Sequence, residues 1–135
     1  MRYAILIYDE NTANPATEPP PAEVIQQVMN EYNAYTQMLK DRGVFLAGEA
    51  LEPVPTATTI RIKDGQTVTT DGPFAETKEA LGGFYIVEAK DLDEALDYGA
   101  QCPGAKYGGS IEVRPVVDFP TDYAPSAETA GSASA

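Results

Sequence analysis

The order in which strand-like and helix-like patterns follow one another limits the fold of this 135-residue chain more than any other feature. Helices are predicted where apolar residues recur at spacings of three and four. The first covers residues 23–42 and stops at Gly43, and the second begins at an Asp91–Glu94 capping box and ends near residue 100. Strands are predicted over residues 2–8, 44–50, 84–88 and 110–117. Residues 57–70 alternate around Asp64–Gly65, which predicts a hairpin with a tight primed turn.

With the hairpin set aside, the order is strand, helix, strand, strand, helix, strand. This order is typical of the ferredoxin-like, α+β arrangement, in which two helices cover one face of an antiparallel sheet. The other face needs cover, and a second subunit would supply it. The sequence therefore predicts a homodimer that encloses a barrel-like interior, a dimeric α+β barrel. We expect the domain to span residues 1–117 and the Pro-, Ser- and Ala-rich residues 118–135 to form a disordered tail.

Composition excludes several classes of function. A net charge of −12 argues against partners such as nucleic acid or an anionic membrane surface. No apolar run reaches the length of a membrane span, and the first residues do not form a signal peptide, so we expect a cytoplasmic protein. With no histidine and one cysteine, Cys102, neither a metal site nor an internal disulfide is expected. Gly82–Gly83 leads into a strand rather than a helix, so no nucleotide cofactor is expected either.

The stretch from residue 71 to residue 85 is irregular and carries charged and aromatic side chains among glycines and a proline. Such a segment between regular elements is where sites usually lie. The proline-rich loop over residues 9–22 is longer than most connections and would border the same site. We therefore expect a small-molecule cleft beside residues 71–85.

Two carboxylates are the candidate catalytic residues, and each has a structural alternative. Asp71 is either a cap on the turn that follows it or a general base in a partly dry cleft. Glu49 either forms an ion pair with Arg61, Arg114 or Lys78, or shares the cleft with Asp71 as an acid/base pair.

Five further residues complete the predicted site as substrate-binding groups. Lys78, on a short helical turn with Glu76 and Glu79, would hold an anionic substrate or the loop itself. The Tyr8 and Tyr85 hydroxyls would reach a cleft from strand ends. Phe74 would plug and anchor the loop. The set of binding residues predicted is Tyr8, Phe74, Lys78, Tyr85 and Arg114.

Specific motifs in this chain resemble those of a known family. Residues 71–74 read Asp-Gly-Pro-Phe, Gly82–Tyr85 reads Gly-Gly-Phe-Tyr, and residues 91–95 read Asp-Leu-Asp-Glu-Ala. Supporting pieces are Gly-Glu-Ala-Leu at 48–51, Cys-Pro at 102–103 and Ile-Glu-Val-Arg-Pro-Val at 111–116. Over residues 2–117 the chain resembles the DGPF group of YCII-related proteins.

The resemblance implies a dimeric α+β barrel with a cleft near the DGPF loop, and it implies less about activity. The genes of such proteins often neighbour those of extracytoplasmic-function sigma factors. Members of the wider superfamily resemble small-molecule lyases or isomerases that use a histidine–aspartate pair. Asp71 would correspond to the aspartate, but the chain has no histidine, so the pair cannot form.

Two functions fit these observations. The first is a cofactor-independent isomerase, lyase or cyclase with Asp71 as proton acceptor. The alternative is a non-catalytic ligand-sensing or protein-interaction module linked to sigma-factor signalling. A carboxylate with a raised pKa in a pocket would favour the enzyme, and an exposed apolar patch would favour the module.

Overall fold

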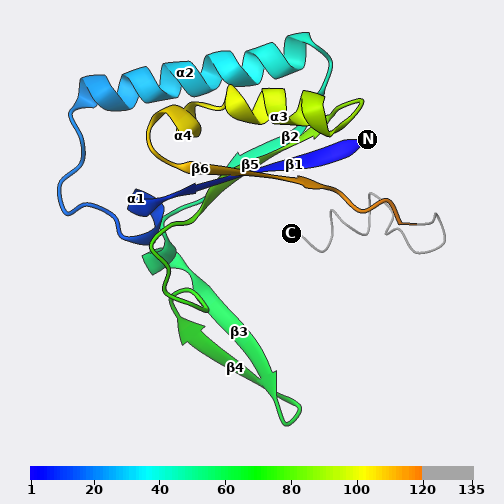
Figure 1. Cartoon of the computed structure of the whole chain (residues 1–135). Coiled ribbons are helices and arrows are strands. Elements are labelled where there is room, and N and C mark those ends of the chain that lie inside the picture. The colour runs from blue at the N-terminus through cyan, green and yellow to red at the C-terminus, as the bar shows by residue number, and fades with distance from the viewer. Residues whose placement is uncertain (120–135) are drawn as a thin grey trace.

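The computed structural model describes residues 1–119, which form a four-stranded antiparallel sheet, helices on one of its faces and a projecting hairpin (Figure 1). From residue 120 onward the predicted tail lies outside the described residues. The helices are α1 (Glu10–Ala13), α2 (Ala22–Asp41), the 3-10 turn η1 (Val54–Thr56), α3 (Leu92–Ala100) and α4 (Pro103–Lys106). The strands are β1 (Arg2–Asp9), β2 (Phe45–Ala50), β3 (Thr58–Lys63), β4 (Gln66–Asp71), β5 (Ala80–Glu88) and β6 (Ser110–Pro115).

The strand order of the main sheet is β2-β5-β1-β6, and every neighbouring pair is antiparallel. This is the order of a ferredoxin-like sheet, so the predicted α+β class and topology are confirmed. β1 and β5 form the central pair, with Ile5 opposite Tyr85. In the described part of the chain, no helix combines the length and the apolar character that a membrane span needs.

Side chains of β1 alternate between two environments. Tyr3, Ile5 and Ile7 are buried beneath the helices, whereas Leu6 and Tyr8 are half-buried on the face that no helix covers (Figure 1). The buried set continues onto the neighbouring strands and helices. Its members are Tyr3, Ile5, Ile7, Tyr35, Leu39, Tyr85, Val87, Ala89, Ala95, Tyr98 and Cys102.

The helix α3 begins at the predicted N-cap but buries only part of the face predicted. The Asp91 carboxylate accepts a hydrogen bond from the Glu94 backbone N–H at 2.9 Å, which confirms the predicted cap. The spacing of apolar residues predicts a buried stripe of Leu92, Ala95, Leu96, Gly99 and Ala100, and this prediction is half right. Ala95 and Gly99 are buried, whereas Leu92 and Leu96 are 48% and 46% exposed and Ala100 is exposed as well. The small residues face the sheet: a Cβ on Gly99 would lie 3.0 Å from a Val113 methyl. The close approach of α3 to β6 therefore turns the leucines outward.

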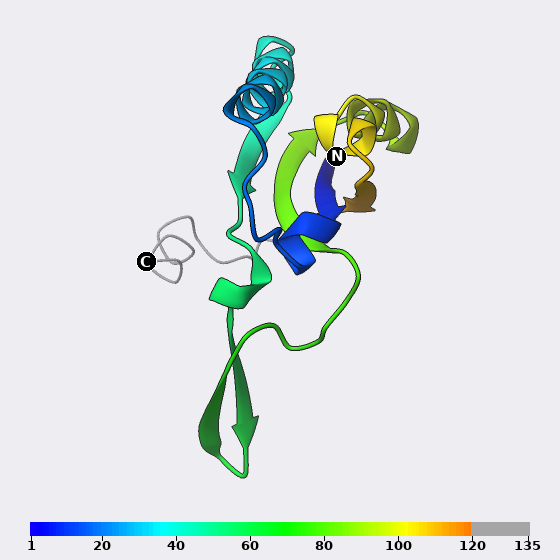
Figure 2. The same cartoon turned by 90° about the vertical axis from the view of Figure 1, so that its left-hand side faces the viewer.

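The strands β3 and β4 form a separate two-stranded sheet, which we call the arm (residues 58–71). It extends away from the main sheet on the side opposite the helices (Figures 1 and 2). Asp64 and Gly65 both have positive φ values, 51° and 77°, as a primed turn requires. The predicted hairpin is confirmed.

The segment predicted as a loop over residues 9–22 contains the short helix α1. The Asp9 carboxylate caps it by accepting hydrogen bonds from the Thr12 N–H at 2.6 Å and the Thr12 hydroxyl at 3.0 Å. The cap ties the end of β1 to the start of α1.

A substitution at Leu39 tests the packing of α2 against the core. It is 0% exposed on α2, so Leu39→Ala should lower the free energy of unfolding by about 2–5 kcal/mol through lost burial and a cavity. Leu96→Ala, at a helix position that is 46% exposed, should cost less than about 1 kcal/mol. Urea denaturation of the two variants measures both values, and equal losses would contradict this packing.

Candidate functional site

A cleft lies between α2 and the main sheet, with a volume of about 420 Å³. We call it the helix–sheet cleft. Its volume lies within the range of about 300–1,000 Å³ that is usual for small-molecule sites. The lining residues are Ile7, Asp9, Tyr32, Asn33, Thr36, Phe45, Gly48, Glu49, Ala50, Gly82, Gly83 and Tyr85.

Three glycines from β2 and β5 keep the cleft open. A Cβ on Gly48 would lie 2.9 Å from the Tyr85 ring, and one on Gly83 would lie 3.0 Å from the Glu49 carbonyl oxygen. At Gly82 a Cβ would lie 2.7 Å from the Thr12 hydroxyl and 2.9 Å from an Asp9 carboxylate oxygen. A side chain at Gly48 or Gly82 would therefore displace Tyr85 or the Asp9–Thr12 pair, and one at Gly83 would press on the backbone of β2.

Tyr85 forms the aromatic wall of the cleft. Its hydroxyl lies 2.7 Å from the Thr36 hydroxyl on α2, and its ring makes edge contacts with Tyr35 and Phe45 at centroid distances of 5.2 Å and 6.2 Å. Burial raises the pKa of the Tyr85 phenol. At neutral pH the hydroxyl is therefore protonated and serves as a hydrogen-bonding group rather than as a base.

Asp9 and Tyr32 stand where the helix–sheet cleft meets a second hollow. That hollow, of about 640 Å³, is also lined by Ile7, Asp9 and Tyr32. Burial raises the pKa of the Tyr32 phenol above its usual value, and the neighbouring Cys102 thiol adds to the shift. A half-buried carboxylate thus lies beside a phenol that stays protonated, an arrangement that can hydrogen-bond a ligand from two sides.

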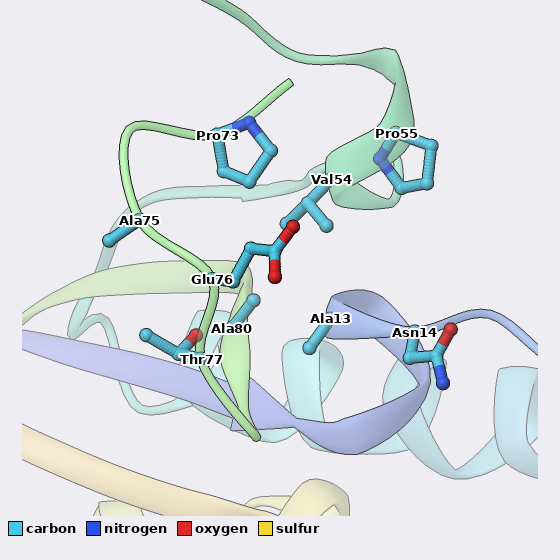
Figure 3. Close-up of a pocket in the computed structure, with 9 residues that line it drawn as sticks. All are labelled: Ala13, Asn14, Val54, Pro55, Pro73, Ala75, Glu76, Thr77 and Ala80. Carbon is cyan, nitrogen blue, oxygen red and sulfur yellow. The ribbon is translucent and has the colours of Figure 1, made fainter.

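A different pocket, of about 420 Å³, lies beside the DGPF loop (Figure 3). It is formed by the end of α1, η1 and residues 73–80, and Glu76 points into it (Figure 3). Glu76 is the one ionisable side chain among its lining residues, and no aromatic side chain lines it. This loop pocket therefore offers less chemistry than the helix–sheet cleft.

The structure places Asp71 and Phe74 away from both pockets. Asp71 is the last residue of β4 and is exposed. Within residues 1–119 the Asp71 carboxylate makes no hydrogen bond to a backbone N–H of the turn, and the Gly72 N–H donates to the Ala57 carbonyl at 2.7 Å. Phe74 is 78% exposed, so the expectation that it plugs the loop is wrong within one chain. Residues 73–79 contain no helical turn, which corrects a further expectation.

The other predicted residues divide between the two sides of the sheet. Tyr85 and the rim residue Glu49 line the helix–sheet cleft. Tyr8 and Arg114 belong to the uncovered face, where the Tyr8 hydroxyl donates to Glu112 at 3.5 Å. Lys78 lies 3.4 Å from the Glu10 carboxylate on the surface.

Within the part of the chain that the structure describes, the seven predicted residues do not share one cleft. Within residues 1–119 Glu49 forms no ion pair, so the expected partnership with Arg61, Arg114 or Lys78 is not found. Of the seven, Glu49 and Tyr85 are the two that line the helix–sheet cleft.

Sequence analysis missed Asp9, Tyr32 and Thr36 as site residues. Asp9 did carry a usable signal, because an acidic residue that ends a buried strand and has Thr12 three positions later is a typical N-cap. Tyr32 and Thr36 lie on the apolar stripe of α2, where a tyrosine at helical spacing indicates core. Only the tertiary packing reveals the cleft.

Across the described residues, no group of three or more His, Cys, Asp or Glu side chains is arranged to hold a metal ion. The polar groups that line the helix–sheet cleft are hydroxyls, one side-chain amide and two carboxylates.

Comparison with known proteins shows the family of this chain. The YCII-related domain family matches residues 1–120, so the chain belongs to this family. An uncharacterized protein of Rhizobium meliloti (strain 1021) is 36% identical over 127 residues, which cover 93% of this chain and 100% of that protein. A solved structure of 5-chloro-2-hydroxyhydroquinone dehydrochlorinase from Burkholderia phenoliruptrix, in complex with 2,5-dihydroxybenzoquinone, is similar with a TM-score of 0.48. It is 20% identical and covers 88% of this chain and 96% of that chain.

The buried phenols predict an alkaline limit to stability. The folded state raises the pKa of Tyr85 above its ordinary value of 10.0, so it favours the protonated phenol. Stability should be constant below that pH and should fall as the pH rises above it, because the unfolded chain ionises first. Urea unfolding between pH 8 and 11, followed with phenolate absorbance, measures this. The variant Tyr85→Phe should lose less stability over the same pH range. Ionisation of all tyrosines near pH 10 while the protein remains folded would contradict the burial of these phenols.

Proposed function

We propose that this protein binds a small, uncharged organic molecule in the helix–sheet cleft. The observation that carries the proposal is the combination of an aromatic wall, a glycine floor and a carboxylate at one end, within one hollow of about 420 Å³. Binding sites for small organic molecules have this character, mostly apolar with a few placed polar groups. The loop pocket beside Pro73 lacks it.

Charge narrows the ligand class. Asp9 and Glu49 line the cleft, and no lysine, arginine or histidine is among its lining residues. The whole chain carries a net charge of −12. An anionic ligand would meet like charge on every side, so a neutral molecule with hydroxyl or carbonyl groups fits best. Lys78, expected to attract an anion, lies beside Glu10 instead and does not line the cleft.

Asp9 is the group best placed to accept a proton from such a ligand. Each of its oxygens accepts one hydrogen bond from Thr12 and retains further acceptor capacity. The protonated Tyr32 and Tyr85 hydroxyls would orient a carbonyl or hydroxyl group. This supports a cofactor-independent isomerase, lyase or cyclase in which Asp9 takes the role that sequence analysis assigned to Asp71.

One observation favours a second function, ligand sensing without catalysis. Asp9 already serves as the α1 cap, and a capping carboxylate needs no catalytic role. A ligand that bridges α2 and the sheet would then change the stability of the fold, and no proton would be transferred. The two functions share the cleft and differ in whether bound molecules exchange protons.

The exchange of protons can be measured on cleft ligands. Single-ring ketones and phenols are screened by chemical-shift changes, and α-proton exchange of the bound ketones is followed in D₂O. Asp9→Asn should lower the exchange rate about 100-fold, the scale of a lost general base. Asparagine caps a helix about as well as aspartate, so the fold should be retained.

Asp71→Asn is the matched control, because it makes the same change at an exposed position outside the cleft. Its exchange rate should equal that of the unaltered protein. Loss of exchange in Asp71→Asn alone would return the catalytic role to the DGPF loop. If the unaltered protein and both variants bind the ketones without exchanging their α-protons, the sensing function is favoured.

We also propose that the uncovered face of the main sheet pairs with a second copy of the chain. Side chains at this face include Ala4, Leu6, Phe84 and Ile86, which pair across β1 and β5. All are only half-buried in one chain, and the helices lie on the other side (Figure 1). Covering this apolar strip with its own copy would complete a second layer of the domain.

Analytical ultracentrifugation at micromolar concentration tests the pairing. The unaltered protein should sediment as a dimer, and Leu6→Lys, which buries a charge in the interface, should shift it to monomer. Leu96→Lys adds the same charge on the helix side and should remain dimeric. A monomeric unaltered protein would contradict the pairing.

A further inference from the structure

The arm exposes apolar side chains that no other element within residues 1–119 covers. Ile60 and Ile62 are 63% and 66% exposed, and both lie on one face of the hairpin, opposite Thr69 and Thr67. A two-stranded hairpin that packs on nothing is marginally stable in water. Contiguous exposed isoleucines on such an element mark a surface that binds another protein.

The reverse face of the arm carries its two basic side chains, Arg61 and Lys63. Neither forms an ion pair within residues 1–119. Asp64 at the turn and Asp71 at the end of β4 balance them, so the formal charge of the arm is zero in a chain whose net charge is −12. The arm therefore lacks the acidic excess that would repel a second copy of the chain.

The position of the arm fits the same partner. The arm extends on the side of the main sheet that faces away from the helices, so it stands beside the uncovered face (Figures 1 and 2). The two strands are closed at their base by the Gly72 N–H, which donates to the Ala57 carbonyl, and by the Thr59 hydroxyl, which donates to the Gly72 carbonyl at 2.8 Å. A second copy placed on that face would lie against the arm.

We propose that the Ile60–Ile62 face of each arm packs against the body of a second copy, so that two arms grip the dimer from opposite sides. The inference rests on the dimer proposed above and adds a contact that the sheet face alone does not supply. The exposed isoleucines become buried on association, and the reverse face with Arg61 and Lys63 stays in solvent.

The dimer dissociation constant tests the contact. Ile60→Glu should raise it at least tenfold, because a carboxylate would be buried against the partner's surface. Thr70→Glu introduces the same charge on the reverse face of the arm, opposite Thr59, and should change the constant less than threefold. Circular dichroism of both variants checks that the body remains folded.

A second measurement detects the contact itself. Cys102, the native cysteine, is 1% exposed and should not react with a thiol-specific spin label. In the variant Gln66→Cys the label should therefore attach to residue 66 alone, near the tip of the arm. In a mixture of spin-labelled chains and ¹⁵N-labelled chains, body amides of the ¹⁵N-labelled copy should be broadened.

The outcomes separate this inference from the dimer on which it rests. A protein that stays monomeric overturns both. A dimer whose dissociation constant is unchanged by Ile60→Glu, with no broadening between copies, overturns the arm contact and leaves the sheet-face dimer standing.

Discussion

The alternation of side chains along β1 divides the molecule into two functional sides. Ile5 and Ile7 point under the helices, where they build the core and one edge of the helix–sheet cleft, whereas Leu6 points to the uncovered face. Because the side-chain period of a strand is two, a shift of one residue in register would exchange the two sides entirely. The cleft and the apolar sheet face therefore depend on the same pairing of β1 with β5.

The end of β1 is also where the fold and the proposed chemistry meet. Asp9 caps α1, and Gly82 passes so close to it that a larger residue there would displace the Asp9 and Thr12 side chains. The cap holds the carboxylate at the end of the cleft, and the glycine keeps the space beside it free. The protein belongs to the YCII-related domain family and has no histidine, and the proposed proton acceptor is this carboxylate beside two phenols.

Features that depend on neighbouring residues in the sequence were predicted well, whereas features that depend on tertiary packing were not. The Asp91 cap and the Asp64–Gly65 turn depend on neighbours within three residues, and both were read correctly from the sequence. Leu96 was assigned to the core because spacing alone cannot show that Gly99 draws its helix face to β6. Of the candidate site, Tyr85 and Glu49 were predicted, whereas Tyr32 lay hidden in an apolar stripe.

The central claim is that the helix–sheet cleft is the binding site. A crystal structure of the protein with a single-ring ketone selected by chemical-shift changes tests it most directly. We expect the ring between α2 and β5, beside Tyr85, with its oxygen within hydrogen-bonding distance of Asp9 or Tyr32. A ring in the loop pocket beside Pro73 and Glu76, with the helix–sheet cleft empty, would contradict the account and return attention to the DGPF loop.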